Sequence, residues 1–161
     1  MTEANRLRGR HVKASDQEPK SLVSVFVGHC TASPDAPALL GETRSYSYSE
    51  LLTAAEKVAG RLLDADVQPG DLVGLYAHRS VDAVIAMLGI LRAGAAYVPL
   101  DPTHAPEHLG FIAEDLALST VLVADTYKDQ APLHVAKETT LIPMAEALAN
   151  DPGDREWPTP V

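Results

Sequence analysis

The chain has 161 residues, of which 46% are hydrophobic and 22% charged, and this is the composition of one globular domain. A collagen-like rod, a coiled coil and a wholly disordered chain are excluded by it. The formal net charge of −9 divides into +2 over the first 20 residues and −11 over the rest. Because an acidic body repels phosphate backbones and anionic lipid, we expect neither nucleic acid nor a membrane as a partner.

The N-terminal third predicts a tail, a helix and a hairpin. Residues 1–20 are basic and poor in apolar side chains, and they lack the amphipathic face of a transit peptide, so a flexible basic tail is expected there. Apolar residues then recur at helical spacing between Leu22 and Cys30, and the turn residues 33–35 close this helix. Residues 38–40 and 44–46 flank Gly41-Glu42-Thr43, and this arrangement predicts a small hairpin with a glycine-containing turn.

The middle of the chain alternates between helix and strand signals. Residues 47–50, Ser-Tyr-Ser-Glu, fit a capping box, and apolar residues from Leu51 to Leu62 follow at i, i+3 and i+4 steps. After the turn at residues 68–71, the apolar run 72–76 is typical of a strand that is covered on both faces. Ser80 then caps another helix, and Gly94 stands where a left-handed residue ends one.

The same alternation continues toward the C-terminus. We expect, in order, a strand over 95–100, a helix over 106–118, a strand over 120–124, a strand over 140–142 and a short helix over 143–149. Strands separated by helices of this length predict an α/β fold, a parallel sheet within three αβα layers. Residues 151–161 have the proline- and charge-rich composition of a linker. The predicted domain therefore covers residues 21–150.

Two segments resemble core motifs of the adenylation domains of nonribosomal peptide synthetases. Residues 46–51, Tyr-Ser-Tyr-Ser-Glu-Leu, are similar to the first motif, Leu-Ser/Thr-Tyr-x-Glu-Leu, with Tyr46 at the usual Leu position. Residues 91–102, Leu-Arg-Ala-Gly-Ala-Ala-Tyr-Val-Pro-Leu-Asp-Pro, match the second motif almost position for position. A twelve-residue pattern placed after a helix seldom recurs by chance. The family's next pattern, Tyr-Pro-x-x-Arg, reads His-Ala-Pro-Glu-His over residues 104–108.

The resemblance implies the N-terminal part of the core of an AMP-forming ligase. A complete domain of this family forms an aminoacyl-adenylate from an amino acid and ATP with Mg²⁺, then loads it onto the phosphopantetheine thiol of a carrier protein. The family's Ser/Thr/Gly-rich phosphate loop, which ends in Pro-Lys-Gly, does not occur between Met1 and Val161, and the catalytic lysine of the C-terminal lid lies further along the family's domain. We therefore expect a fragment that is inactive alone, with no catalytic, cofactor-binding or metal-binding residues.

Three other interpretations stay open at this point. The chain is also compatible with a piece of an aryl-acid or acyl-CoA ligase, although the sequence of residues 93–102 favours amino-acid activation. A second alternative is a non-catalytic partner or remnant that pairs with the remainder of the domain. The third is a flavodoxin-like nucleotide-binding module, against which the absence of a phosphate loop argues.

Few side chains are candidates for chemistry. Asp101 follows a predicted parallel strand at its carboxyl end, where such folds place their sites, but a turn role for its carboxylate is favoured. His104 and His108 have the spacing of metal ligands on one helix. Pro106 lies between them and starts the predicted helix, so we expect neither a shared face nor a metal site.

The remaining histidines and the cysteine are predicted to be structural. His29, His78 and His134 belong to no catalytic pattern, which favours surface or core positions for them. Cys30 is the single cysteine, so no intrachain disulfide forms, and a packed thiol in a reducing cytoplasm is expected.

Overall fold

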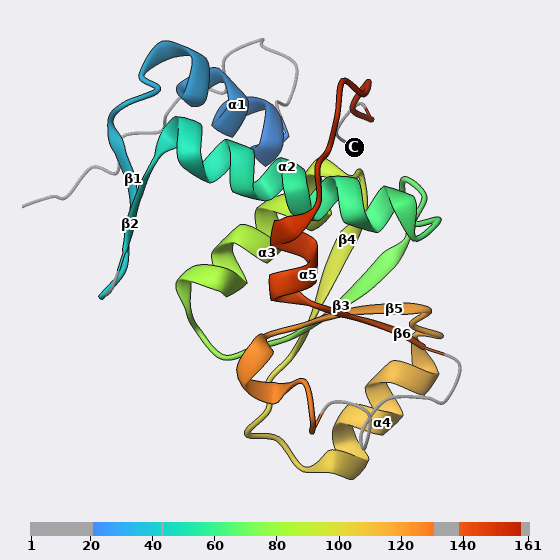
Figure 1. Cartoon of the computed structure of the whole chain (residues 1–161). Coiled ribbons are helices and arrows are strands. Elements are labelled where there is room, and N and C mark those ends of the chain that lie inside the picture. Colours follow the sequence, from blue (N-terminus) through green and yellow to red (C-terminus); the bar gives the residue numbers. More distant parts are fainter. Residues whose placement is uncertain (1–20, 43, 131–138, 159–161) are drawn as a thin grey trace, which may run out of the picture.

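The computed structural model describes residues 21–42, 44–130 and 139–158. Helices lie on both sides of a parallel sheet, and a small hairpin stands apart from it (Figure 1). The elements in chain order are α1 (Leu22–Ala32), β1 (Pro37–Leu40), β2 (Ser45–Ser47), α2 (Tyr48–Asp64), β3 (Leu72–Tyr76), α3 (Val81–Arg92), β4 (Ala96–Leu100), α4 (Pro106–Asp115), β5 (Thr120–Val123), η1 (Asp125–Tyr127), β6 (Thr140–Pro143) and α5 (Met144–Ala149). The basic tail lies outside the described residues.

The main sheet has the order β4-β3-β5-β6, and all its strands are parallel. This confirms the predicted three-layer α/β class. Side chains alternate between the two faces of a strand. In β3, Val73 and Leu75 join the cluster under α2, α3 and α5, whereas Tyr76 joins the cluster under α4. The almost wholly apolar sequence of this strand follows from its burial on both faces.

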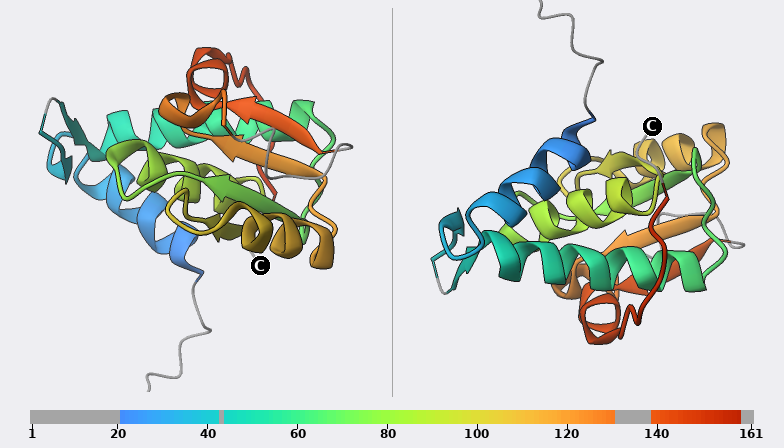
Figure 2. Two further views of the ribbon diagram at one scale, coloured as in Figure 1. Left: turned by 90° about the horizontal axis from the view of Figure 1, so that it is seen from below. Right: turned by 90° about the horizontal axis from the view of Figure 1, so that it is seen from above.

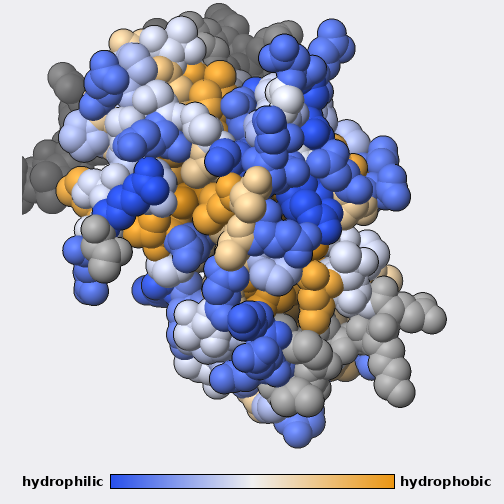
Figure 3. Space-filling view, viewed as in Figure 1, coloured by the Kyte–Doolittle hydropathy of each residue, from blue (hydrophilic) through white to orange (hydrophobic). Residues whose placement is uncertain are grey.

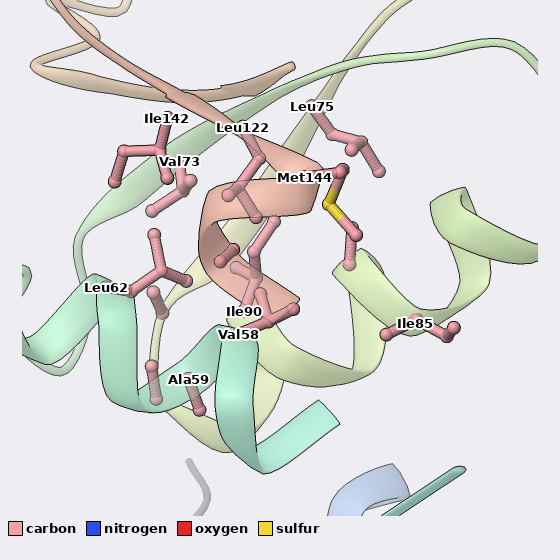
Figure 4. Close-up of a cluster of buried hydrophobic side chains, with 14 of the residues drawn as sticks. Val58, Ala59, Leu62, Val73, Leu75, Ile85, Ile90, Leu122, Ile142 and Met144 are labelled. Carbon is pink, nitrogen blue, oxygen red and sulfur yellow. The ribbon is translucent and has the colours of Figure 1, made fainter. Parts of the chain in front are cut away.

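The larger cluster, called here the first core, lies between the sheet and helices α2, α3 and α5 (Figure 4). Its side chains come from segments far apart in the sequence and are almost completely buried. Prominent members are Val58, Leu62, Val73, Leu75, Ile85, Ile90, Leu122, Ile142 and Met144. The second core packs α4 onto the opposite face of the sheet through Tyr76, Leu100, Leu109, Ala113, Leu118, Val121 and Val123. In the right-hand view of Figure 2, α1, α2 and α3 lie over the first-core face.

Helix α2 begins with the predicted capping box. The Ser47 hydroxyl accepts the Glu50 N–H at 3.3 Å, and the Glu50 carboxylate accepts the Ser47 N–H at 2.9 Å. Helix α3 begins at Ser80, whose hydroxyl accepts the Ala83 N–H at 3.1 Å. Both caps satisfy amide groups that lack partners inside the helix, and they fix where each helix starts.

Helices α2 and α3 approach closely at Gly89. A Cβ atom on this residue would lie 2.6 Å from Cβ and Cγ1 of Val58 and 2.9 Å from the Ala55 carbonyl oxygen. Beside this contact, the Arg92 guanidinium donates to Glu56 at 2.9 Å, and both side chains are largely buried. The glycine therefore sets how near the two helices pack.

Three helices that precede parallel strands end in the same way. After α3, Gly94 has φ +79°, and the Ala95 N–H returns to the Ile90 carbonyl. Asp66 after α2 and Ala117 after α4 have φ values of 63° and 47°, with the same return bond from the following residue. This is the Schellman geometry, and in each case it turns a buried apolar residue into the core.

The predicted helix over 106–118 is three residues too long. Helix α4 ends at Asp115, because the Leu118 N–H bonds back to the Ala113 carbonyl at 2.9 Å and directs the Leu118 side chain into the second core. No glycine follows this helix, so the sequence carries no signal for the residue at which it ends. The short turn η1 was also not expected, although the other helices and strands lie within a few residues of their predicted bounds.

Residues 151–158, called here the strap, have no helix or strand but pack against the body of the fold. Arg155 donates to the Gly60 carbonyl and to Asp64, both at 3.2 Å. The Arg92 guanidinium lies over the ring of Trp157, with the Arg92 Cζ atom 4.8 Å from the ring centroid. The composition that predicted a linker thus belongs to a segment that is held at several points, and its role as a linker stays a prediction.

We predict that Gly89→Ala lowers the free energy of unfolding by about 1–3 kcal/mol, because the added methyl overpacks the α2–α3 contact. Gly28→Ala is the matched control, since a Cβ there meets nothing within 4 Å on the exposed side of α1. It should raise stability by roughly 0.5–1 kcal/mol. Urea denaturation of both variants measures the difference, and equal effects would contradict the close contact.

Ala117→Gly should stabilise the chain by about 1 kcal/mol, because the Cβ atom of alanine makes the left-handed conformation unfavourable and glycine has no such atom. The same substitution at Ala145, in the first turn of α5, should destabilise. Thermal unfolding followed by circular dichroism distinguishes the two signs. A loss of stability at both positions would show that the left-handed turn after α4 is wrongly assigned.

Candidate functional site

The carboxyl edge of the sheet brings together polar side chains that are far apart in the sequence. His78 follows β3, Asp101 follows β4, and Tyr127 belongs to η1 after β5. His78 Nδ1 lies 3.3 Å from Asp101 Oδ1, and the His78 ring meets the Tyr127 ring edge to face with centroids 5.2 Å apart. Parallel α/β sheets place ligand sites at this edge, so these three residues form the candidate site.

Asp101 is engaged in a turn, as predicted. Its Oδ1 accepts the Thr103 N–H at 2.9 Å and the Thr103 hydroxyl at 2.8 Å. These two hydrogen bonds hold the pKa of the Asp101 carboxyl below its ordinary value, with a smaller contribution from the nearby imidazoles of His78 and His104. Asp101 Oδ1 therefore accepts both hydrogen bonds of the turn and also faces the His78 imidazole. This supports a structural role for Asp101.

Two tyrosine rings connect the site to the second core. The Tyr76 ring is buried and meets the Tyr127 ring edge to face, with centroids 5.9 Å apart. Burial, and secondarily the neighbouring Tyr127, raises the pKa of the Tyr76 phenol, so this phenol stays protonated at neutral pH. Tyr127 thus links the exposed imidazole of His78 to the second core. Sequence reasoning missed Tyr127, because its single turn of helix carries no periodic pattern.

Pro106 starts α4 as predicted, so His104 lies outside the helix that carries His108, but the two rings do meet. Their rings lie edge to face with centroids 5.7 Å apart. Pro106 is the first residue of α4, and His104 precedes it in a turn that folds back so that its ring reaches His108 in the first helical turn. Within residues 21–42, 44–130 and 139–158, no group of three or more His, Cys, Asp or Glu side chains is placed to hold a metal ion.

A pocket lies between the hairpin and the start of α3. It has a volume of about 730 Å³ and is lined by Leu39, Leu40, Gly41, Glu42, Arg44, Tyr46, Arg79, Ser80, Val81 and Asp82. Two cations and two carboxylates face it together with apolar side chains. In the space-filling view, apolar surface gathers between the hairpin and the helices (Figure 3). The Arg44 guanidinium covers the Tyr46 ring at 4.4 Å and fixes one wall.

Cys30 is a packed thiol, as predicted. Its side chain is buried, and its Sγ donates to the Tyr48 carbonyl at 3.4 Å. Burial raises the pKa of the thiol, which disfavours the nucleophilic thiolate. His29 is exposed on α1 with its ring 5.9 Å from the Tyr48 ring, in agreement with a surface position. His134 lies outside the described residues.

Chemically, the carboxyl edge offers one imidazole–carboxylate pair and a phenol. Such a pair orients and shuttles a proton, but nucleophilic catalysis also requires a nucleophile within hydrogen-bond reach of the base. The hydroxyl that contacts this pair, from Thr103, donates to the carboxylate and lies in the turn. At this edge the imidazole–carboxylate pair is therefore held by the turn at Asp101.

Comparison with known proteins identifies the family to which this chain belongs. Residues 26–159 match the family model described as AMP-binding enzyme. The chain belongs to this family. Among curated relatives it is 38% identical over 119 residues to a linear gramicidin synthase protein of Brevibacillus parabrevis, covering 74% of this chain and 2% of that protein. It is 38% identical over 125 residues to surfactin synthase subunit 3 of Bacillus subtilis (strain 168), covering 78% of this chain and 10% of that one.

Solved structures agree with the sequence match. The α-methyl-L-serine-AMP bound form of the nonribosomal peptide synthetase FmoA3 superposes with a TM-score of 0.76 at 26% identity, over 86% of this chain and 15% of that chain. The four-domain synthetase holo-AB3403, bound to AMP and glycine, gives a TM-score of 0.70 at 30% identity, over 80% and 9%. The chain thus corresponds to the N-terminal part of a synthetase adenylation domain and spans a small share of its relatives' length.

The two adenylation motifs form strands, a helix cap and turns. The first forms β2 and the capping box of α2. The second runs from the end of α3 through Gly94 and β4 to the Asp101 turn, so it builds one side of the carboxyl edge. No helix in the described ranges is long and apolar enough to cross a membrane.

We predict that Thr103→Val raises the pKa of Asp101 part of the way to its ordinary value, since valine loses the hydroxyl donor but keeps the backbone N–H. Thr103→Ser should leave this pKa low. Because the folded pKa is lowered, the stabilisation from this carboxylate is present above the unfolded pKa and is lost as pH falls through the folded one. Carboxyl ¹³C NMR titration measures both variants, and identical titration curves would contradict the hydroxyl bond.

Proposed function

We propose that this chain forms the N-terminal scaffold of an amino-acid-activating adenylation domain and does not adenylate by itself. The observation that carries the proposal is the second motif, residues 91–102, which continues from α3 through β4 to the Asp101 turn at the carboxyl edge. The motif therefore contains Asp101, which is one of the three residues of the candidate site. The named synthetases among the relatives support amino-acid activation as the reaction class.

The complete domain, in this proposal, catalyses two steps. An amino-acid carboxylate attacks the α-phosphate of ATP, which gives an aminoacyl-adenylate and releases pyrophosphate. The phosphopantetheine thiol of a carrier protein then attacks the acyl carbon and releases AMP, leaving a thioester. The partners of this chain are the remainder of the adenylation domain and that carrier protein, in the ATP-containing cytoplasm.

The described residues do not fit a complete Mg²⁺–ATP site. Magnesium takes near-octahedral oxygen ligands at about 2.0–2.1 Å, whereas Asp101 Oδ1 already accepts two hydrogen bonds from Thr103 and faces His78. ATP phosphates also need a cradle of backbone N–H groups, and the sequence contains no Gly-rich phosphate loop. We therefore assign ATP, Mg²⁺ and phosphopantetheine binding to the remainder of the domain and its carrier.

ATP–pyrophosphate exchange tests the inactivity of this chain. The 161-residue protein, supplied with the twenty amino acids, ATP and Mg²⁺, should give exchange at the background of the protein-free reaction. The positive control is the adenylation domain of surfactin synthase subunit 3 in the same assay. Exchange above background that depends on an amino acid would overturn the inactivity.

A chimera tests the scaffold role. The 125-residue segment that aligns with surfactin synthase subunit 3 replaces its counterpart in that protein. The chimera should retain exchange with that protein's own amino acid. A second chimera carrying Gly89→Ala should lose thermal stability and keep the same substrate preference. A first chimera that folds cooperatively but gives no exchange contradicts the proposed role.

A further inference from the structure

The start of α4 brings two histidine rings into contact on the surface. His104 and His108 meet edge to face, with ring centroids 5.7 Å apart and ring planes inclined at 67°. Both side chains are exposed. Neither imidazole forms a hydrogen bond or a close ion pair with any residue that the structure describes. Their ring nitrogens are therefore available to a ligand from solution.

These are also the two positions at which the chain departs from its family. The adenylation pattern Tyr-Pro-x-x-Arg reads His-Ala-Pro-Glu-His over residues 104–108, so histidine stands at both the tyrosine and the arginine position. Arginine has no acceptor atom and tyrosine stays protonated at neutral pH, whereas neutral imidazole is the commonest metal ligand in proteins. Both departures therefore change the chemistry in the same direction.

The backbone holds both histidines in place. The His104 N–H donates to the Asp101 carbonyl at 3.0 Å, inside the turn that the Asp101 carboxylate and Thr103 close. The His108 N–H donates to the Ala105 carbonyl at 3.0 Å, in the first turn of α4. Because the two positions are fixed before any ligand binds, little backbone entropy is lost on binding.

The separation of the rings is close to that of two imidazoles on one ion. A zinc ion lies about 2.0–2.1 Å from an imidazole nitrogen, hence about 3.2 Å from the ring centre, and two rings at a tetrahedral angle have centres about 5 Å apart. The observed 5.7 Å is within about 1 Å of this separation. Since both side chains are exposed, rotation about their χ torsions can close the difference without moving the backbone.

The electrostatic surroundings favour a cation. Residues 93–127 contain five carboxylates and no lysine or arginine. Asp101 interacts with the His104 imidazole, and Glu107 adjoins His108 in the sequence. The positive end of the α4 dipole opposes a cation at this place, but its effect is that of about half an elementary charge. The two nearby carboxylates carry full negative charges, so the balance favours a bound cation.

We propose that His104 and His108 together bind one transition-metal ion that prefers nitrogen ligands, Cu²⁺, Ni²⁺ or Zn²⁺. The imidazoles supply two coordination positions and water supplies the others, since no group of three His, Cys, Asp or Glu side chains in the described ranges is placed to hold an ion. Affinity follows the general series, with Cu²⁺ above Ni²⁺ and Zn²⁺. Mg²⁺ takes oxygen ligands and does not compete. The site is independent of the proposed function, which assigns Mg²⁺ and ATP to the remainder of the domain.

Calorimetric titration of the 161-residue protein with NiCl₂ tests the pair against the family pattern. The double variant His104→Tyr with His108→Arg introduces the residues of that pattern. It should bind Ni²⁺ on the order of 100-fold more weakly, because two ligands on one rigid frame bind with higher avidity than separate ligands. Each single variant should show a similar loss. Melting curves by circular dichroism report whether the variants fold.

His29→Ala is the matched control, because it removes another exposed histidine, on α1. It should leave the Ni²⁺ affinity unchanged. A second readout locates the ion: substoichiometric Cu²⁺ should broaden the imidazole proton signals of His104 and His108 before those of His29 and His78, since a paramagnetic ion relaxes the nearest nuclei most. MgCl₂ in excess should change neither result.

Three outcomes overturn the proposal. They are equal Ni²⁺ affinity of the protein and of the folded double variant, no binding at millimolar Ni²⁺, and broadening by Cu²⁺ that begins at His29 or His78. Each rejects the two-histidine site alone, because ATP–pyrophosphate exchange and the chimera test the proposed function without a transition-metal ion.

Discussion

The structure depends on the burial of β3 between two hydrophobic cores. Val73 and Leu75 pack under α2 and α3, while Tyr76 packs under α4. Gly74 makes room on the second face, since a Cβ there would lie 2.7 Å from Cγ2 of Val121. Because both neighbours of β3 pair with it in parallel, the central strand fixes where β4 and β5 end, and therefore where the carboxyl-edge side chains meet.

This arrangement separates the scaffold from the chemistry. The adenylation motifs in this chain form a helix cap, a left-handed helix end and an edge strand, and each has a physical reason that is independent of ATP. The His78–Asp101 pair and Tyr127 line one side of the carboxyl edge. In the proposed function, the groups that neutralise phosphate come from the remainder of the domain.

Local signals in the sequence predicted most elements, because caps and periodic apolar faces act over a few residues. Ser47 and Ser80 begin their helices as expected, and the glycine after α3 is left-handed. Long-range consequences escaped prediction. The left-handed conformation of Ala117 arises from the burial of the next residue, and Trp157 is held by an arginine 65 positions earlier in a segment that has linker composition. The contact between His78 and Tyr127 likewise requires the order of strands, which no pattern in the sequence contains.

Native-state amide hydrogen exchange of the 161-residue protein tests the central role of β3 most directly. The amides of residues 73–76 should exchange most slowly and only through global unfolding, with β5 next. The hairpin β1–β2 and the strap should exchange faster, because their apolar side chains pack against the first core but are only partly buried. The denaturant dependence of exchange in β3 should equal that of unfolding measured by circular dichroism. Exchange of β3 through a smaller opening, while the hairpin stays protected, would contradict this central role.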